Sequence, residues 1–142
     1  EHIKFHKDKL RASGLRPTKQ RLAICKILFS RKETFHFTIY QLKKIAEKNI
    51  KKKISLSTLY NTVHAFEKKG YLKEISLKGN KTFFDTNTKN HHHFYDEDSS
   101  QLIDIKNENI SINNLPTLPI GKKLKEIEIT FRVATSNQGQ KN

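Results

Sequence analysis

The stretch from residue 90 to residue 105, NHHHFYDEDSSQLIDI, gathers histidines and carboxylates within a short length of chain. In an extended segment the side chains alternate, so His91 and His93 point to one side while His92 points to the other. The same alternation places Asp104 on the face opposite its isoleucine neighbours. A carboxylate in an apolar strand is costly to bury unless a cation or hydrogen bonds satisfy it.

Metal binding is the chemistry that these side chains could perform. Two imidazoles and a carboxylate are suitable ligands for Fe(II), Mn(II) or Zn(II). Further oxygen ligands are available nearby from Asp85, Asp96, Glu97 and Asp98. The competing interpretation is a His-x-His pair that occurs by chance and caps a polar loop. Asp104 favours the metal site, because it adds a third ligand of a suitable type.

The elements that must position these ligands differ sharply in charge along the chain. The 142 residues carry a net charge of +14, but residues 1–90 hold 22 lysines and arginines against 7 acids, whereas residues 91–142 hold 6 against 7. A lysine-rich proteome is the alternative explanation, although such a bias would not stop at residue 90. The pattern favours a polyanion-binding module joined to a regulatory or oligomerising module. We expect two domains, 1–85 and 86–142.

The sequence also argues against several classes of protein. Its longest apolar runs are only a few residues, far short of the roughly 20 needed to cross a bilayer, and no signal peptide is visible. Its single cysteine, Cys25, excludes an intramolecular disulfide and a four-cysteine zinc site. We therefore expect a cytoplasmic protein with no membrane partner.

The basic half is predicted to form three helices. The first is capped by Thr18 and continues with apolar residues at helical spacing. The second begins at Thr38 and ends near Asn49 and the lysines that follow. The third is predicted to be capped by Ser57 and to stop at Gly70.

The third helix leaves polar and aromatic side chains outside its apolar stripe. Groups of this kind near a helix N-terminus suit base edges and phosphates in a major groove. A solvated face without any function is the alternative. The candidate base-reading residues are Thr58, Tyr60, Asn61 and His64.

A basic hairpin is predicted to follow the third helix. Lys78-Gly79-Asn80 is a turn signal between two short strands. Helices followed by such a hairpin describe a winged helix-turn-helix, whose basic side chains contact the DNA backbone and add affinity with little sequence information. The candidate phosphate-binding residues are Arg16, Lys19, Arg21, Lys78 and Lys81.

After residue 90 the pattern changes to short strands. They are predicted in QLIDI, NISI and KEIEITFRV, separated by a segment with two prolines and a glycine. A small sheet of this kind has exposed edges, which are usually covered or paired. Pairing between two copies of the chain is the simplest solution, so we expect a homodimer. The predicted fold class is α+β, an N-terminal winged helix-turn-helix followed by a small C-terminal α/β dimerisation domain.

These motifs together resemble the ferric uptake regulator (Fur) superfamily of bacterial metal-dependent transcription factors, over residues 8–133. GLRPTKQR is similar to the family's opening motif, ISLSTLYNTVHAFEKKGYL to its recognition helix, and HHHFY followed by LIDI to its metal-binding hinge and first dimerisation strand. LYNT, KTFFDTN and HHHFY are most similar to the iron response regulator (Irr) branch, whose members sense haem or iron status. The resemblance implies an obligate dimer that binds double-stranded operator DNA.

The resemblance also implies a regulatory metal site at the hinge between the domains. Its ligands fall on His36, Asp85, His91, His93 and Asp104. One divalent ion per subunit is then expected, Fe2+ or Mn2+ in the cell and Zn2+ in the purified protein. Aspartate at position 104 is similar to the peroxide-sensing (PerR) branch, in which bound Fe(II) reacts with hydrogen peroxide and a ligand histidine is oxidised. In a haem-responsive, Irr-type regulator, haem would bind at His91, His92 or His93 and release DNA.

Several positions depart from the family's pattern. Asp96 and Ser99 stand where many members have the first cysteine pair of a structural zinc site, so no such zinc is expected. Asn90 occupies one ligand position of a second, ancillary site. Asn61 replaces the family's usual arginine, which implies a different preferred operator. The LPTLPIGKK stretch is too short for the long helix that other members place between dimerisation strands.

The sequence thus predicts a homodimeric metal-dependent regulator, mainly a repressor, of iron, haem or oxidative-stress genes, and not an enzyme. Two alternatives come from other classes. A small metallo-hydrolase would need an open coordination position and a nearby general base, but the sequence offers no second catalytic constellation. A non-specific RNA-binding protein would use the same basic half.

Overall fold

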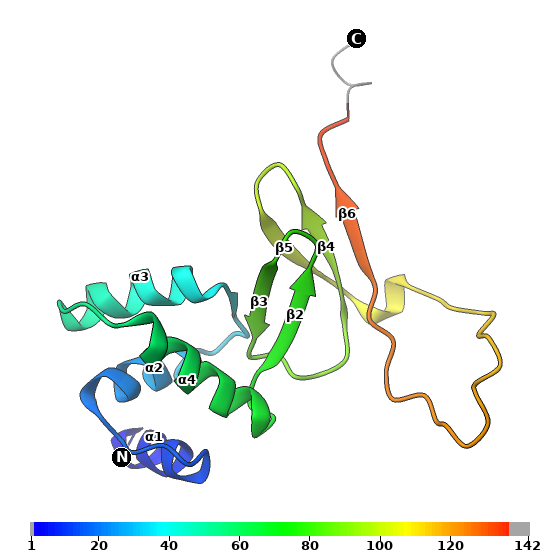
Figure 1. Cartoon of the computed structure of the whole chain (residues 1–142). Coiled ribbons are helices and arrows are strands. Elements are labelled where there is room, and N and C mark those ends of the chain that lie inside the picture. Colours follow the sequence, from blue (N-terminus) through cyan, green and yellow to red (C-terminus); the bar gives the residue numbers. More distant parts are fainter. Residues whose placement is uncertain (1, 137–142) are drawn as a thin grey trace. The chain divides into compact units, whose positions relative to one another are not determined.

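The protein is described by a computed structural model over residues 2–136. It separates into two compact units, Glu1–Thr88 and a second unit that begins at Lys89. Figure 1 follows the chain from the N-terminal helices to the last strand. The predicted domain boundary, after residue 85, falls at the end of a strand of the first unit.

The described part of the first unit contains four α-helices, α1 (His2–Ala12), α2 (Lys19–Phe29), α3 (Ile39–Ile50) and α4 (Leu56–Lys68). The predicted cap of α2 and the predicted start of α3 are confirmed, because the hydroxyls of Thr18 and Thr38 each accept a backbone N–H of the first turn. The predicted cap of α4 is wrong. Ser55, rather than Ser57, accepts the N–H of Thr58 at 3.1 Å, so Ser57 lies inside the first turn.

The sequence pattern did not predict α1, because its contact with the rest of the unit is not an apolar stripe. His6 and Leu10 are its buried side chains. The ammonium group of Lys9 lies 3.7 Å from the ring centroid of Tyr71 and 4.3 Å from that of Phe29. This cation–π arrangement attaches α1 to α2 and to the chain after α4.

A three-stranded sheet completes the first unit, in the order β1 (His36–Phe37), β3 (Lys81–Asp85) and β2 (Lys73–Leu77). Both strand pairs are antiparallel. The predicted hairpin is confirmed, and Gly79 and Asn80 in its turn have φ angles of 79° and 60°. The short strand β1 was not predicted, and it places His36 directly opposite Asp85.

The core of the first unit lies between the helices and one face of this sheet. Cys25 belongs to it, and burial raises the pKa of its thiol to about 11. Fully or almost fully buried side chains from every helix and from two strands form the core, among them Leu10, Ile24, Cys25, Phe37, Leu42, Leu59, Phe66 and Phe84.

The second unit is built on another three-stranded sheet, in the order β5 (Gln101–Ile105), β4 (His92–Asp96) and β6 (Thr130–Val133). Strand β4 is antiparallel to β5 and parallel to β6. A long connection between β5 and β6, drawn yellow to orange in Figure 1, contains one 3-10 turn, Asn107–Asn109.

Two of the predicted strands of the second unit need correction. The NISI segment is not a strand, and KEIEITFRV is extended into the sheet only over its last four residues. Strand length here is set by pairing with β4, which offers partners only for residues 130–133. The α+β class is confirmed, but the described part of this unit is a β-sheet with a 3-10 turn rather than an α/β domain.

Candidate metal centre and nucleic-acid interface

The second unit brings together three of the predicted metal ligands. His93 and Asp104 are direct partners in the β4–β5 register, so their side chains share a face of the sheet. One carboxylate oxygen of Asp104, Oδ1, lies 3.2 Å from Nε2 of His93 and 3.5 Å from Nε2 of His91. The two imidazole rings are 4.4 Å apart between centroids. Both histidines are buried, whereas the Asp104 side chain is 42% exposed.

The proton on His91 can be assigned from its hydrogen bond. Its Nδ1 lies 2.7 Å from the carbonyl oxygen of Lys89, and a carbonyl oxygen only accepts, so Nδ1 carries the proton. In the neutral ring, Nε2 then presents its lone pair towards Asp104. A cation bound between these two acceptors, or a proton on Nε2, would satisfy both. A backbone carbonyl on one ring nitrogen is also the usual way in which proteins orient a metal-binding histidine.

His92 belongs to the opposite face, as the alternation predicts. Its Nδ1 accepts the backbone N–H of Ile129 at 3.1 Å. This bond ties β4 to the residue just before β6. His92 is therefore separated from the pair formed by His91 and His93.

The first unit holds the other two predicted ligands, also as a strand pair. His36 and Asp85 are partners in the β1–β3 register, and Lys73 is the partner of Asp85 on the other side. Asp85 is almost fully buried, and its carboxylate accepts the N–H of Asn87 at 2.9 Å. The five predicted ligands therefore fall into one His–Asp strand pair in each unit, with His91 beside the pair of the second unit.

The other acids near the histidines have structural partners. The carboxylate of Asp96 accepts the N–H groups of Asp98 and Ser99, at 2.9 and 3.3 Å, in the turn between β4 and β5. Asp98 accepts both the N–H and the hydroxyl of Thr135 at 2.5 Å. Hydrogen bonding by the Thr135 side chain, followed by its N–H, lowers the pKa of Asp98. Asp96 therefore stabilises the turn itself, and Asp98 connects the turn to the chain after β6.

A basic hollow marks the first of two candidate nucleic-acid surfaces. It has a volume of about 540 Å³ and lies where the N-terminus of α2 meets the first turn of α4. The guanidinium of Arg21 donates to the carbonyl of Arg16 at 2.9 Å, which holds two of its basic residues together. A helix N-terminus attracts anions. The hollow is lined by Arg16, Thr18, Lys19, Gln20, Arg21 and Thr58.

The remaining base-reading candidates are exposed along α4. The rings of Tyr60 and His64 lie 5.8 Å apart, and His64 also lies edge-on to Phe84 at 6.0 Å. Asn61 and His64 line a second hollow of about 510 Å³. Lys68 and Lys69 line it too. They were not among the predicted DNA-binding residues, although paired lysines at the end of a helix are visible in the sequence.

The last two predicted phosphate-binding residues belong to the hairpin of β2 and β3. Lys78 and Lys81 are exposed at the hairpin turn. All nine predicted DNA-binding residues therefore lie in the basic first unit. No helix among residues 2–136 combines the length and apolar character that crossing a membrane requires.

Comparisons with known proteins connect these features to one family. The model described as the ferric uptake regulator family matches residues 12–132. The peroxide-responsive repressor PerR of Staphylococcus aureus (strain Mu50) is 32% identical over 97 residues, which are 68% of this chain. The match spans 64% of that protein's length.

Solved structures show the same fold. The ferric uptake regulator of Vibrio cholerae has a TM-score of 0.65 at 20% identity, covering 91% of this chain and 98% of that one. The ferric uptake regulator of Pseudomonas aeruginosa with manganese has a TM-score of 0.63 at 20% identity, covering 92% and 97%. These likenesses confirm a helical N-terminal domain followed by a β-sheet domain.

Proposed function

Because the chain belongs to the ferric uptake regulator family, we propose that it is a transcriptional regulator whose binding to operator DNA depends on a metal ion. The observation that carries the proposal is the cluster of His91, His93 and Asp104 in the second unit. Family membership argues against the metallo-hydrolase alternative. Operator binding also implies a cytoplasmic location.

The donor set of this cluster fits a divalent metal of the iron, manganese or zinc type. Its two imidazole nitrogens and one carboxylate oxygen lie close together, and the carbonyl of Lys89 orients His91. A metal ion bound there would place a positive charge between the lone pairs of these three ligand atoms. A relative with the same fold was solved with manganese, which supports this choice of metal.

The His36–Asp85 pair is the proposed second half of the site. Both residues stand on adjacent strands of the first unit and share one face of its sheet. Ligands drawn from both units would restrict the movement of one unit against the other. In a dimer, this restriction would set the separation of the two α4 helices, which must match successive major grooves about 34–36 Å apart. Changing such an equilibrium from mostly open to mostly closed needs about 5.5 kcal/mol of differential binding.

The proposed DNA interface combines the exposed face of α4 with the basic hollow and the wing. Tyr60, Asn61 and His64 would read base edges or methyl groups, together with Thr58 at the start of the helix. The hollow that Arg16 and Arg21 help to line would accept a backbone phosphate. Specific DNA, rather than random RNA, is therefore the proposed polyanion, and direct competition between the two at physiological salt distinguishes them.

An apolar face on the second unit supports the homodimer. Phe94, Ile103 and Phe131 are neighbours across its three strands, and their exposed fractions are 38%, 47% and 45%. The rings of Phe94 and Phe131 lie 5.6 Å apart. Strands β5 and β6 also lie at the two ends of the sheet order. A second copy of the chain could cover both the face and an edge.

The experiment compares operator binding by His93→Asn and His92→Asn with that of the wild type. The operator is first selected from random duplex DNA, and fluorescence anisotropy is measured with and without Mn(II). Asparagine can replace Nδ1 but not Nε2, so the His92 variant keeps the bond to Ile129 while the His93 variant loses the proposed ligand. We expect metal-dependent operator binding to survive in His92→Asn and to be lost in His93→Asn. If the operator affinity of the wild type is the same with and without Mn(II), the proposal is refuted.

The signal that the regulator senses has two candidates. Peroxide is favoured by Asp104 and by similarity to a protein named as a peroxide-responsive repressor. Mass spectrometry of the Fe(II)-loaded protein after peroxide treatment should then show one added oxygen on a ligand histidine. A haem-responsive, Irr-type signal is the alternative, and its test is a Soret shift that disappears when His91, His92 and His93 are replaced. The separation of His92 from the other two leaves one face with two imidazoles for haem.

A further inference from the structure

The connection between α3 and α4 is short, basic and irregular. Its three lysines, Lys51, Lys52 and Lys53, are exposed, and Lys51 has a φ of 55°. The connection leads directly into the helix that carries the candidate base-reading residues. An irregular segment in this place needs contacts that fix its backbone, because hydrogen bonds to bases tolerate only a few tenths of an ångström.

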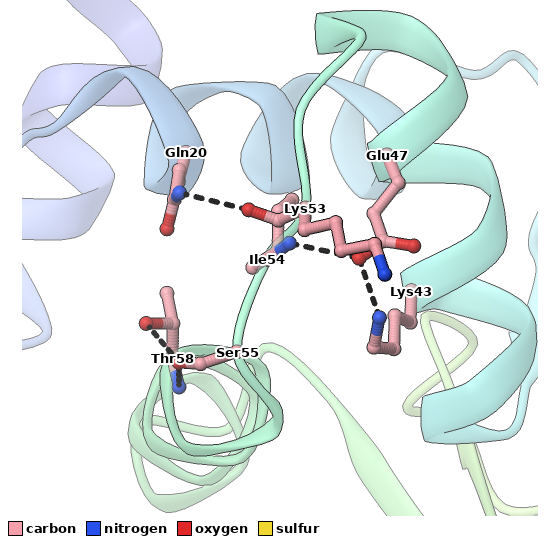
Figure 2. A network of polar contacts seen from close by, with 7 residues as sticks. All are labelled: Gln20, Lys43, Glu47, Lys53, Ile54, Ser55 and Thr58. Carbon is pink, nitrogen blue, oxygen red and sulfur yellow. Dashed lines mark hydrogen bonds and ion pairs between the residues drawn. The ribbon is translucent and has the colours of Figure 1, made fainter.

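Two contacts hold the two sides of one peptide group of this connection, the group that joins Lys53 to Ile54, and Figure 2 shows them together. From α3, the carboxylate of Glu47 accepts the backbone N–H of Ile54 at 2.8 Å. The same oxygen of Glu47 accepts from the ammonium group of Lys43. From α2, the side-chain amide of Gln20 donates to the carbonyl of Lys53 at 3.4 Å.

The anchored peptide stands immediately before the start of α4. Ile54 is 1% exposed, so its side chain is embedded in the core while its N–H is held by α3. The next residue, Ser55, is the N-cap of α4 and accepts the N–H of Thr58. The hydrogen bond from the Ile54 N–H to the Glu47 carboxylate therefore holds the backbone one residue before the N-cap of α4.

We propose that Glu47 is a positioning residue for DNA reading, which fixes α4 by holding the N–H of Ile54. The inference rests on the proposed function. The ion pair between Lys43 and Glu47 joins two half-buried side chains one helical turn apart on α3, and pairs at this spacing contribute little. The bond to Ile54 differs, because an ionised acceptor binds a backbone donor strongly and in a fixed direction. The hydrogen bond from Lys43, followed by that from Ile54, lowers the pKa of Glu47, which keeps the acceptor ionised at neutral pH.

The test uses three variants of the full chain. Glu47→Ala removes the acceptor, and Glu47→Gln keeps an acceptor oxygen but removes the charge. Glu33→Gln is the matched control, because Glu33 is an exposed acid of the same unit and its replacement changes the net charge equally. Amide hydrogen exchange over residues 51–60 and anisotropy with selected operator and with random duplex DNA are measured on each.

We expect Glu47→Ala to speed exchange of the Ile54 amide by about tenfold to a hundredfold, the range for losing a hydrogen bond to a charged group. Its ratio of operator affinity to random-duplex affinity should fall by about tenfold or more, while random-duplex affinity stays within about twofold. Glu47→Gln should retain most of that ratio, and Glu33→Gln all of it. A charge effect alone would instead make the two glutamine variants alike and raise their affinity for every duplex.

Three results would overturn the inference. One is an Ile54 amide as protected in Glu47→Ala as in the wild type. Another is an unchanged operator-to-random ratio in a Glu47→Ala protein whose α1 and α2 amides remain protected. A third is a Glu47→Gln protein as impaired as Glu47→Ala, because the retained acceptor should rescue binding. A wild-type chain that does not distinguish operator from random DNA would refute the proposed function instead, while exchange still shows whether Glu47 holds the connection.

Discussion

Binding of Mn(II) to the wild-type chain should protect both units from amide hydrogen exchange, because the two His–Asp pairs are proposed to share one ion. A ligand at 100 times its Kd stabilises the state that binds it by about 2.7 kcal/mol. Exchange that requires unfolding should therefore slow by about a hundredfold. Amides in the core are the suitable probes, such as Val63 and Phe84 in the first unit and Tyr95 and Leu102 in the second.

Asp85→Asn separates a shared site from one confined to the second unit. Asp85 is only 1% exposed, and its Oδ1 accepts the N–H of Asn87. Asparagine can keep this bond while the charge is lost. Mn(II) should still protect the second unit of this variant, where His91, His93 and Asp104 remain, but the protection of the first unit should fall, because His36 is then the one proposed ligand left in that unit.

Glu74→Gln is the matched control for this experiment. Glu74 is an exposed acid on β2, the strand next to Asp85 in the same sheet, and it pairs with Phe84 rather than with a proposed ligand. In the Glu74→Gln protein, Mn(II) should protect the amides of both units as strongly as in the wild type. Protection of the wild type that stops at the second unit, or an Asp85→Asn protein protected like the wild type in both units, would refute the shared site.

Three further predictions concern single side chains. Arg16→Ala should reduce the slope of log affinity against log salt concentration for operator binding by about 0.9, which corresponds to one phosphate contact. Anisotropy over a series of salt concentrations measures this slope. An equal reduction in Lys44→Ala, which changes an exposed lysine of α3, would contradict a local interface. Folded protein should resist iodoacetamide at pH 8, because burial raises the pKa of the Cys25 thiol to about 11; rapid labelling seen by mass spectrometry would contradict this. The bond from Thr135 lowers the pKa of Asp98 below its ordinary 3.8, so it should stabilise the chain after β6 above about pH 3.8 and be lost as pH falls through the lower folded-state value. The protection factor of the Thr135 amide, which is its exchange rate relative to that of an unprotected amide at the same pH, should fall over this range in the wild type and stay constant in Asp98→Asn.

Features that depend on neighbours along the chain could be predicted from the sequence. Thr18 and Thr38 cap helices because the acceptor and donor are three residues apart. The alternation of His91, His92 and His93 is likewise a local property of an extended backbone. The cap of α4 shows the limit of such rules, since both Ser55 and Ser57 have suitable hydroxyls. Contacts of the preceding residues, above all the bond between Glu47 and Ile54, accompany the earlier start.

Features that depend on pairing between distant segments could not be predicted. Strand β1 has only two residues, so it exists through its partner β3 rather than through any pattern of its own. Strand β6 joins β4 in parallel across a long connection, and its length follows from that pairing. The acids of the DED segment offered oxygen ligands by composition alone. Asp96 instead accepts N–H groups of its own turn, whereas the partners of Asp98, the N–H and hydroxyl of Thr135, come from the far end of the second unit.

Strand register explains why each proposed half-site is a cross-strand pair. Side chains directly opposite in an antiparallel ladder share a face, and a slip of one residue would move one ligand to the other face. In the second unit, the buried neighbours Tyr95 and Leu102 occupy the same face as His93 and Asp104. A slip of β5 by one residue would move both Leu102 and Asp104 away from the face that carries Tyr95 and His93. The apolar pair therefore specifies the register that brings the ligands together, and a change at Leu102 should impair metal binding although it offers no ligand itself.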